Sequence, residues 1–563
     1  MSAELHFNNK QFDVAPGSSL FEYAEAVGMR VPTSCNKQGK CKECLVEVLE
    51  GMEFLSAKTE KETHLRDQFR LSCQCKVTGD KSLIRCNTMR RGDMKIETGS
   101  LKLPALHKEL KIDPAVTRDG DTILLDGKKI SHSKEAIHGI AMDLGTTTVV
   151  LRLINLETGK IVASNSFENP QRFGGSDVMA RIHYDTEHRG KLLQRTLAGY
   201  LTHAIEDFPV DPQTIYEMVV AGNSTMRDIF FRLNVYSIGQ SPYRSITEIE
   251  SDENKRTTTS VTAITKRLRL PIHPKARIYG LPIISGHVGA DAAACMLAID
   301  IANEDKLVAL MDIGTNTELV LGNKNKILAA SCPAGPAFEG GRISNGMPGL
   351  PGAIEKVKIN PNGSVDIQVI GGGIPEGICG SGLIDTLSEL LKNGRMNNLG
   401  RLKDEEDKFV LYTGDDYQIY VSENDINELA QAKGANVAGL HTVFNTYGIR
   451  FNDIDSFYLA GGFGRNLDIE SSKRIGLIPN IAGDKIIQIG NASIEGASIA
   501  LLSVSKRNEL EELVKKVIHC RLETHPSFFE YFVEGCQFNP VEPIEDRTGS
   551  GHEDKYQSEL KYE

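Results

Sequence analysis

Six cysteines near the N-terminus constrain what this chain can fold into more than any other feature. They all precede residue 90, in the order Cys35, Cys41, Cys44, Cys73, Cys75 and Cys86. The first three form a C-x5-C-x2-C run in a loop with Gly39 and three lysines. Such thiolates, with one distant partner, can bind a 2Fe-2S cluster, because each of its two irons needs two protein sulfurs. We therefore predict this cluster, although the spacing leaves its fourth ligand open. A zinc knuckle and unrelated reduced thiols are the alternatives, and zinc is disfavoured because its sites use paired CxxC units.

The residues around the cysteine loop predict a small α/β domain. Alternating side chains over Leu5–Val14 indicate a hairpin, and Leu20–Val27 should form a helix after a turn and an N-cap serine. A strand is expected over Leu45–Leu49, directly after the third cysteine. This order resembles a plant- or adrenal-type ferredoxin. The spacing fits the adrenal type better, because the plant-type run is one residue shorter.

Length, charge and cysteine usage exclude several classes of protein. A chain of 563 residues should divide into three or four domains. Its formal net charge of -11 argues against a nucleic-acid binder, which needs a basic face. The eleven cysteines are concentrated near one end rather than spread as a disulfide framework, which favours the cytoplasm. We see no basic start with an apolar run that would indicate a secretory signal, and no apolar run long enough to span a membrane.

A turn of the form Asp-x-Gly-Thr occurs twice, each time after a buried apolar strand and before a second one. The residues that we expect to contact phosphate and Mg2+ are Asp143, Gly145, Thr146 and Thr147 in the first copy and Asp312, Gly314, Thr315 and Asn316 in the second. The glycine lets the backbone approach an anion, the hydroxyls donate to phosphate oxygens, and an aspartate can hold hydrated Mg2+. Turn threonines often have no such role, but the duplication favours a phosphate site.

A third segment, Phe457–Asn466, is a strand that runs into a glycine-rich turn. Its glycines, Gly461, Gly462 and Gly464, suit close packing of the backbone against an adenosine group. A Rossmann fingerprint is excluded because the segment lacks the G-x-G-x-x-G spacing, and no Walker A sequence occurs in the chain.

These three segments resemble the two phosphate motifs and the adenosine motif of the acetate kinase, sugar kinase, heat-shock ATPase and actin superfamily. The resemblance implies two ribonuclease H-like α/β lobes that close on ATP and Mg2+, with Asp143 or Asp312 orienting the attacking water through the metal. Residues 219–226 and 377–385 are rich in small side chains and resemble the helices that cross at the hinge of this fold. A fold that binds nucleotide without hydrolysing it is the alternative.

The pairing of a ferredoxin domain with this ATPase fold resembles the reductive activators of corrinoid-dependent enzymes. Residues 169–178, 333–341 and 530–538 carry the likeness outside the motifs above. The family implies ATP-dependent transfer of one electron from the 2Fe-2S cluster to inactive cob(II)amide, which becomes cob(I)amide. It also implies a homodimer in an anaerobe, a corrinoid protein of a methyltransferase or O-demethylase system as partner, and a ferredoxin- or flavodoxin-type donor. The ferredoxin-like domains of this family carry an Arg-Leu-x-Cys-Gln run. That run occurs here at residues 70–74, which favours Cys73 as the fourth ligand.

We therefore predict a multidomain α/β protein. It should contain a β-grasp ferredoxin-like domain at 1–92, a linker at 93–135, a middle domain with the first phosphate motif at 136–205, an actin-like ATPase domain at 206–540, and a disordered acidic tail at 541–563. Two other enzyme classes compete: a small-molecule kinase with a redox-sensing ferredoxin domain, and the activators of 2-hydroxyacyl-CoA dehydratases. The latter share the ATPase fold but hold a 4Fe-4S cluster between two subunits, which the cysteine loop disfavours. A nucleotide-gated scaffold without turnover is a further alternative.

Overall fold

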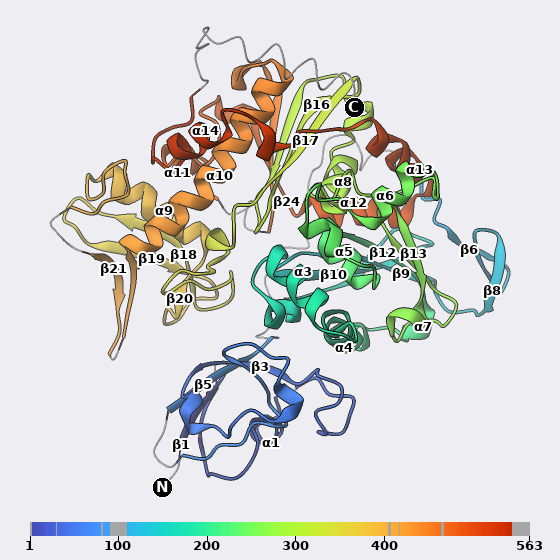
Figure 1. The fold of residues 1–563 in the computed structure, drawn as a ribbon, viewed down its shortest axis with the longest axis horizontal. Coiled ribbons are helices and arrows are strands. Elements are labelled where there is room, and N and C mark those ends of the chain that lie inside the picture. Colours follow the sequence, from blue (N-terminus) through green and yellow to red (C-terminus); the bar gives the residue numbers. More distant parts are fainter. Residues whose placement is uncertain are drawn as a thin grey trace. The chain divides into compact units, whose positions relative to one another are not determined.

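The computed structural model describes residues 3–8, 10–29, 31–79, 83–89, 110–403, 407–415, 417–462 and 467–542. The chain divides into two compact units (Figure 1). The first comprises residues 1–100, 104–299 and 493–515, and the second comprises residues 101–103, 300–492 and 516–563. Among the described residues, no helix combines the length and the apolar character needed to cross a bilayer.

The first unit begins with a five-stranded mixed sheet in the order β2-β1-β5-β3-β4. Its elements are β1 (Ala3–Phe7), β2 (Lys10–Val14), α1 (Leu20–Ala26), β3 (Leu45–Glu50), β4 (Phe69–Leu71) and β5 (Leu83–Thr88). The predicted hairpin, helix and strand are confirmed. Ser19 caps α1 in a capping box with Glu22, and β1 pairs with β5 in parallel. These elements form the predicted ferredoxin-like β-grasp fold.

A small antiparallel sheet follows, where the sequence predicts only a linker. It consists of β6 (Val116–Asp119), β7 (Thr122–Leu125) and β8 (Lys128–His132). Asp113 anchors the start of this segment to the same unit, since its carboxylate accepts from the Ser503 hydroxyl at 2.6 Å. The remainder of the predicted linker, residues 93–109, lies outside the described part of the chain.

A six-stranded sheet in the order β11-β10-β9-β12-β14-β13 forms the rest of the first unit. Its strands are β9 (His138–Leu144), β10 (Thr148–Asn155), β11 (Ile161–Glu168), β12 (Ile215–Gly222), β13 (Val261–Ile264) and β14 (Arg277–Gly280). Its helices are α3 (Val178–Glu187), α4 (Leu192–Glu206), α5 (Ser224–Phe230), α6 (Ile246–Asp252), α7 (Thr265–Leu268), α8 (Ala290–Ala298), α12 (Ala492–Leu502) and α13 (Val504–Leu513). Because β12 pairs in parallel with β9, the predicted boundary after residue 205 would cut this sheet. The units divide instead after Ile299.

The second unit repeats the same strand pattern in the order β24-β23-β15-β16-β17-β25. Its strands are β15 (Val308–Asp312), β16 (Thr317–Asn323), β17 (Lys326–Cys332), β23 (Ser456–Ala460), β24 (Ile486–Gly490) and β25 (Ile518–His519). In both units an antiparallel meander of three strands is extended by a parallel strand beside the first one. The duplicated sequence pattern thus corresponds to a duplicated fold.

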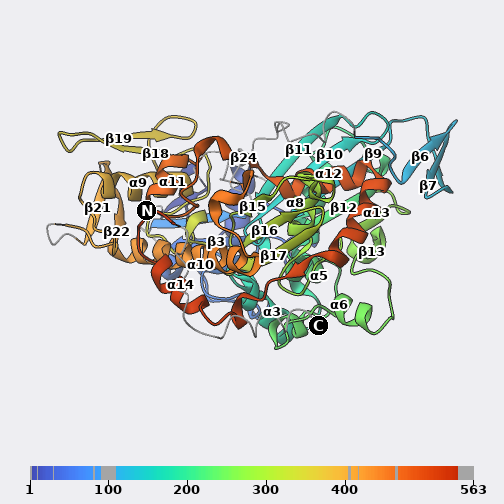
Figure 2. The ribbon, with the colours of Figure 1, turned by 90° about the horizontal axis from the view of Figure 1, so that it is seen from above.

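Within its described residues, the second unit also contains two smaller sheets and four α-helices. They are β18 (Ala353–Ile359), β19 (Val365–Val369), β20 (Gly377–Ile378), β21 (Lys408–Thr413), β22 (Gln418–Ser422), α9 (Gly380–Lys392), α10 (Glu423–Tyr447), α11 (Ile469–Arg474) and α14 (Phe528–Gly535). The long helix α10 packs on β16 and β17 and against α14 (Figure 2). The predicted acidic tail falls outside the described residues from 543 onward.

A close helix crossing occurs outside the two segments expected from their small residues. Residues 219–226 run from β12 into α5, and at 377–385 the start of α9 packs on a strand, since a Cβ on Gly382 would lie 2.3 Å from the Ile354 carbonyl. The close crossing lies between α8 and α12, where a Cβ on Gly496 would lie 1.9 Å from the Ala294 carbonyl. The two expected hinge segments belong to different units, so their crossing stays a prediction. A small residue close to a strand and one between helices look alike in sequence.

Candidate functional site

The cysteine loop brings four thiols together in two pairs. The Sγ atoms of Cys44 and Cys73 lie 3.3 Å apart. Cys35 and Cys41 are hydrogen-bonded to each other, and the Lys40 amide donates to the Cys35 sulfur at 3.3 Å. Strand pairing positions the Cys44 and Cys73 pair, because Cys44 directly precedes β3, Cys73 follows β4, and these strands are antiparallel neighbours.

The environments of the thiols differ between the candidates for the fourth ligand. A hydrogen bond from Cys44, joined by one from Gln74, outweighs burial and lowers the pKa of the Cys73 thiol to about 6. Burial raises the pKa of Cys75 to about 12, and the side chain of Cys75 belongs to the hydrophobic core. Burial also keeps the pKa of Cys86 well above its usual range. Of these three cysteines, Cys73 is the one beside another thiol of the loop.

The donor set fits a two-iron cluster. Within the described residues, no set of three or more His, Cys, Asp or Glu side chains is arranged around a single metal ion. The thiols occur instead as two pairs, and a 2Fe-2S cluster takes two protein sulfurs at each iron. The Gln74 amide donates to Cys73 Sγ at 3.3 Å, a type of contact that tunes such clusters.

A buried ion pair supports the strand that carries Cys73. Arg70 donates to the Glu62 carboxylate at 2.9 Å, and both side chains are fully buried. Glu62 also accepts from the Leu71 amide at 3.0 Å, so both of its oxygens have partners. Hydrogen bonds from Arg70, Thr59 and Leu71 overcome the effect of burial and lower the pKa of Glu62. Glu62 therefore keeps its negative charge inside the ferredoxin-like domain, where its ion pair with Arg70 supports the fold.

Hydrogen bonds from three other segments hold the first Asp-x-Gly-Thr turn. Ser493 at the start of α12 donates to the Asp143 carboxylate at 2.8 Å. Asn223, the N-cap of α5, donates to the Thr146 hydroxyl at 3.0 Å. Asn169 donates from its side chain to the Gly145 carbonyl at 2.8 Å, and its backbone amide donates to the Thr147 carbonyl at 2.6 Å. The turn that joins β9 to β10 is thus fixed before any ligand binds.

The second turn joins β15 to β16 and lies against the glycine segment after β23. Thr315 donates to the Glu339 carboxylate, and its carbonyl accepts from the Gly335 amide at 2.8 Å. A Cβ on Gly461 would lie 2.3 Å from the Ile313 carbonyl, so this position requires a glycine. The structure thus brings Gly461 beside Asp312 and Ile313, at the start of the turn that carries Gly314, Thr315 and Asn316. Gly462 follows at the end of the described stretch, and Gly464 lies outside the described residues.

Several residues hold the two turns, a role that was not assigned to them from the sequence, although three of them lie in segments 169–178, 219–226 and 333–341 singled out there by resemblance. They are Asn169, Asn223, Glu339 and Ser493. An asparagine between a strand and a helix, as at Asn223, is a recognisable N-cap signal, and Asn169 likewise precedes a proline that begins a helical turn. Ser493 carries no such signal, because its contact with Asp143 spans 350 residues of sequence.

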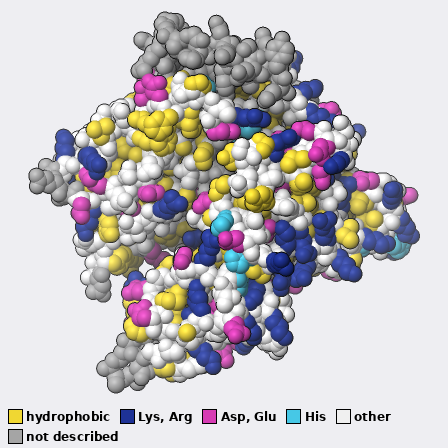
Figure 3. Space-filling model, in the orientation of Figure 1, with side chains coloured by type: hydrophobic (Ala, Val, Ile, Leu, Met, Phe, Trp, Pro, Cys, Tyr) yellow, Lys and Arg dark blue, Asp and Glu magenta, His cyan; other side chains and the backbone are white. Residues whose placement is uncertain are grey.

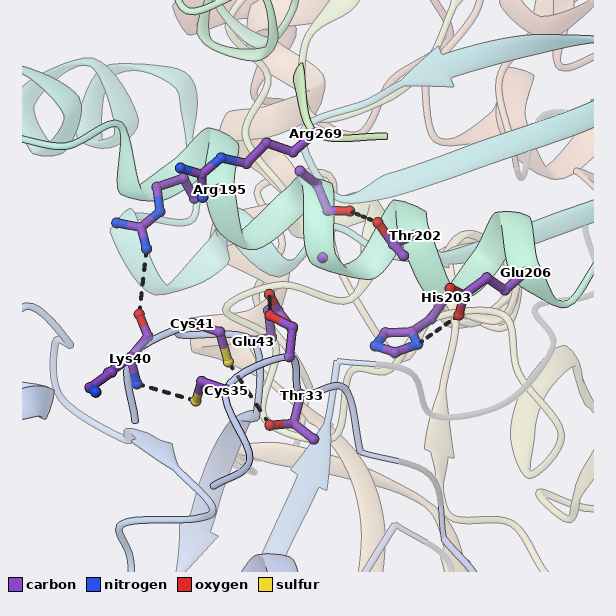
Figure 4. Close-up of a pocket in the computed structure, with 13 residues that line it drawn as sticks. Thr33, Cys35, Lys40, Cys41, Glu43, Arg195, Thr202, His203, Glu206 and Arg269 are labelled. Carbon is purple, nitrogen blue, oxygen red and sulfur yellow. Dashed lines mark hydrogen bonds and ion pairs between the residues drawn. The ribbon is translucent and has the colours of Figure 1, made fainter. Parts of the chain in front are cut away.

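A cavity of about 500 Å³ lies between the cysteine loop and α4 (Figure 4). Cys35 and Cys41 line it from the loop, and Arg195 and His203 line it from α4. Lys and Arg side chains gather over α4 and α7, which Figure 3 shows in dark blue. This face is therefore basic, although the whole chain is acidic.

Comparisons with known proteins follow the division seen in the structure. A model described as a 2Fe-2S iron-sulfur cluster binding domain matches residues 5–78. The RACo middle region matches residues 138–304, and the C-terminal domain of RACo, the ASKHA domain, matches residues 306–545. The chain belongs to the RACo family. The boundary between the two RACo models falls close to Ile299, where the compact units divide.

Individual proteins also match along most of the chain. The corrinoid activation enzyme RamQ of Eubacterium limosum is 27% identical and covers 94% of this chain and 98% of its own length. The [Co(II) methylated amine-specific corrinoid protein] reductase of Methanosarcina barkeri is 27% identical over 70% of this chain and 76% of its own. A solved structure of a reductive activator for a corrinoid, iron-sulfur protein has a TM-score of 0.70 at 27% identity, with 96% and 98% of the two chains covered.

Proposed function

We propose that this protein is an ATP-dependent reductive activator of a corrinoid protein. The observation that carries the proposal is the likeness over 96% of the chain to a reductive activator for a corrinoid, iron-sulfur protein, with the paired thiols and both Asp-x-Gly-Thr turns on one chain. One electron passes to an inactive cob(II)amide, which becomes cob(I)amide. A low-potential donor of the ferredoxin or flavodoxin type then restores the electron.

The proposed ligands of the 2Fe-2S cluster are Cys35, Cys41, Cys44 and Cys73. Their two pairs supply two sulfurs to each iron, and the cluster provides the one-electron carrier. Cys73 is chosen over Cys75 because its sulfur lies beside Cys44, whereas Cys75 is a core side chain.

The proposed nucleotide contacts are Gly145, Thr146, Thr147, Gly314, Thr315, Asn316, Gly461, Gly462 and Gly464. Asp143 and Asp312 are the proposed ligands of hydrated Mg2+, through which either can orient the attacking water. The bracing of the first turn by Asn169 and Asn223 supports this assignment, because a preorganised turn binds phosphate without a further ordering cost.

ATP is needed because the electron transfer runs uphill. A plant-type 2Fe-2S cluster has a potential of roughly -400 mV, and the Co(II)/Co(I) couple lies lower. Each deficit of about 59 mV costs about a factor of ten in a one-electron equilibrium. ATP binding and hydrolysis can offset this cost by changing the state in which the corrinoid protein is docked. The docked complex then acts as a two-state element whose equilibrium is biased by the nucleotide.

The deciding experiment mixes the reduced protein with candidate corrinoid proteins and follows the cob(I)amide absorbance. We expect the absorbance to appear with Mg-ATP and to stay near baseline without nucleotide. Equal reduction with and without ATP would contradict the proposal. The same assay with each corrinoid protein encoded near this chain identifies the partner.

A further inference from the structure

Glu43 is an acidic side chain held inside the cysteine loop at an energetic cost. It lies between Cys41 and Cys44 in sequence and is 8% exposed. Its Oε1 atom accepts from the Ser34 hydroxyl at 2.5 Å, whereas its Oε2 atom is buried and has no hydrogen-bond partner in the described structure. A buried carboxylate oxygen without a partner costs more free energy than a neutral side chain would, so its retention calls for a reason.

The middle region covers most of this side chain, although Glu43 and Gly199 also line the cavity between the loop and α4. Glu43 points from the loop toward α4 (Figure 4), where Gly199 leaves room for it. A Cβ on Gly199 would lie 2.4 Å from Cγ and 2.7 Å from Cδ of Glu43. A glycine in the middle of a helix is unfavourable for helix stability, so close contact with the ferredoxin domain explains it better than helix formation does.

Further contacts hold the ferredoxin domain against this face. The Tyr184 hydroxyl donates to the His64 carbonyl at 2.9 Å, and Arg172 pairs with Glu47 at 3.3 Å. The Arg195 guanidinium also reaches the Lys40 carbonyl at 3.4 Å. The position of Glu43 on Gly199 is thus one part of an extended interface within the first unit.

We propose that Glu43, which packs against Gly199 of the middle region with one carboxylate oxygen buried, is a positioning residue that lowers the reduction potential of the cluster. Reduction adds one electron to a centre that is already anionic, and a nearby carboxylate with little water around it disfavours that added charge. The cluster thereby becomes a stronger reductant while the ferredoxin domain is docked. The inference rests on the proposed ligand set.

The test compares the reduction potential of the full-length wild type with that of Glu43→Gln, which removes the charge and keeps the shape. We expect the equilibrium for reduction by a redox dye to become about tenfold more favourable, which corresponds to about 59 mV toward less negative potential. Glu53→Gln is the control, because that carboxylate is exposed on the same domain and screened by water. An unchanged potential in Glu43→Gln would overturn the inference.

A second set of variants tests the contribution of Gly199. Gly199→Ala should raise the potential and speed the loss of iron to a chelator, because the new methyl group displaces Glu43 and admits water. In a Glu43→Ala background, where Cγ and Cδ are gone, the same Gly199→Ala change should have little effect on either measurement. Equal effects in both backgrounds would overturn the role of the contact. Absence of a 2Fe-2S electron paramagnetic resonance signal from the reduced wild type would instead refute the ligand set.

Discussion

The cysteines show how the surroundings of a residue decide its role. Cys73 and Cys75 are two residues apart and have the same chemistry, yet only the sulfur of Cys73 faces another loop thiol, at 3.3 Å from Cys44. Cys75 points into the core, where burial favours the neutral thiol over the thiolate that binds iron. An offset of two residues in a turn therefore separates a ligand candidate from a packing residue.

Substitution of these two cysteines should have opposite consequences. Cys73→Ala should abolish the visible absorbance of the 2Fe-2S cluster and sharply reduce bound iron, because one iron loses a sulfur. Cys75→Ala should retain both signals and cost roughly 1–2 kcal/mol of stability, since it removes only a small buried side chain. Iron content and absorbance of the purified variants decide the outcome. Loss of the cluster in Cys75→Ala with retention in Cys73→Ala would reverse the assignment.

Lys433 should make the stability of the second unit depend on pH. Its ammonium group is buried in α10, donates to the carbonyls of Gly535 and Gln537, and lies over the Phe538 ring. Burial lowers the pKa of Lys433 from 10.5 to about 7. Between these two values the unfolded chain binds more protons than the folded chain, so stability should rise with pH by up to about 1 kcal/mol per unit.

Calorimetric unfolding at about pH 7 and about pH 8.5 tests this expectation. Lys433→Met should remove the rise between the two conditions and also lower stability, because two carbonyl groups lose their donor. Lys516→Met is the control, since that side chain is exposed. A wild-type chain whose stability falls or stays constant between these pH values would contradict the prediction.

At the scale of elements, helix N-caps connect the fold to the candidate nucleotide site. Asn223 accepts from the Met226 amide at 2.9 Å and so caps α5, while its amide group donates to Thr146. Asp177 caps α3 in the same way, by accepting from the Ala180 amide at 2.9 Å. The two caps thus differ in whether they also hold the first Asp-x-Gly-Thr turn.

Alanine substitution of these caps should separate stability from nucleotide binding. Asn223→Ala and Asp177→Ala should each cost about 1 kcal/mol of stability through the lost cap. Only Asn223→Ala should also weaken ATP binding, by about fivefold to tenfold, because the Thr146 hydroxyl loses its partner. Calorimetric ATP titration gives the comparison. Equal affinity for ATP in the two variants would indicate that the Asn223 contact does not contribute.

The sequence predicts elements well where the signal is local and poorly where contacts are distant. The ferredoxin hairpin and both Asp-x-Gly-Thr hairpins follow from alternation and turn residues within short windows. The boundary placed after residue 205 was wrong because β12 pairs with β9 across a long insertion of helices. Likewise, neither the contact between Gly496 and Ala294 nor that of Ser493 with Asp143 has a local sequence signal, since α12 returns to the first unit from far along the chain.

At the scale of the molecule, the candidate cluster ligands and the candidate nucleotide-binding turns lie in different parts of one chain. The paired thiols belong to the ferredoxin domain, while one Asp-x-Gly-Thr turn lies in each compact unit. The chain passes between the units after residues 299, 492 and 515, so several segments link the two duplicated folds. If the proposed function is correct, the two chemistries should be separable by substitution, but both should be required in the same molecule.

Two variants test this requirement. Cys44→Ser should lose the cluster and still hydrolyse ATP, because Cys44 belongs to the ferredoxin domain whereas the two turns belong to the RACo middle region and C-terminal domain. Asp312→Asn should keep the cluster signal and its potential but lose ATP hydrolysis by about a hundredfold or more, since Mg2+ loses a charged partner. Each variant alone should fail to produce cob(I)amide. A mixture of the two should fail as well, because the electron and the hydrolysed ATP must be supplied by one chain. Activity restored by mixing would show that the two chemistries act from separate chains and would overturn this account of the coupling.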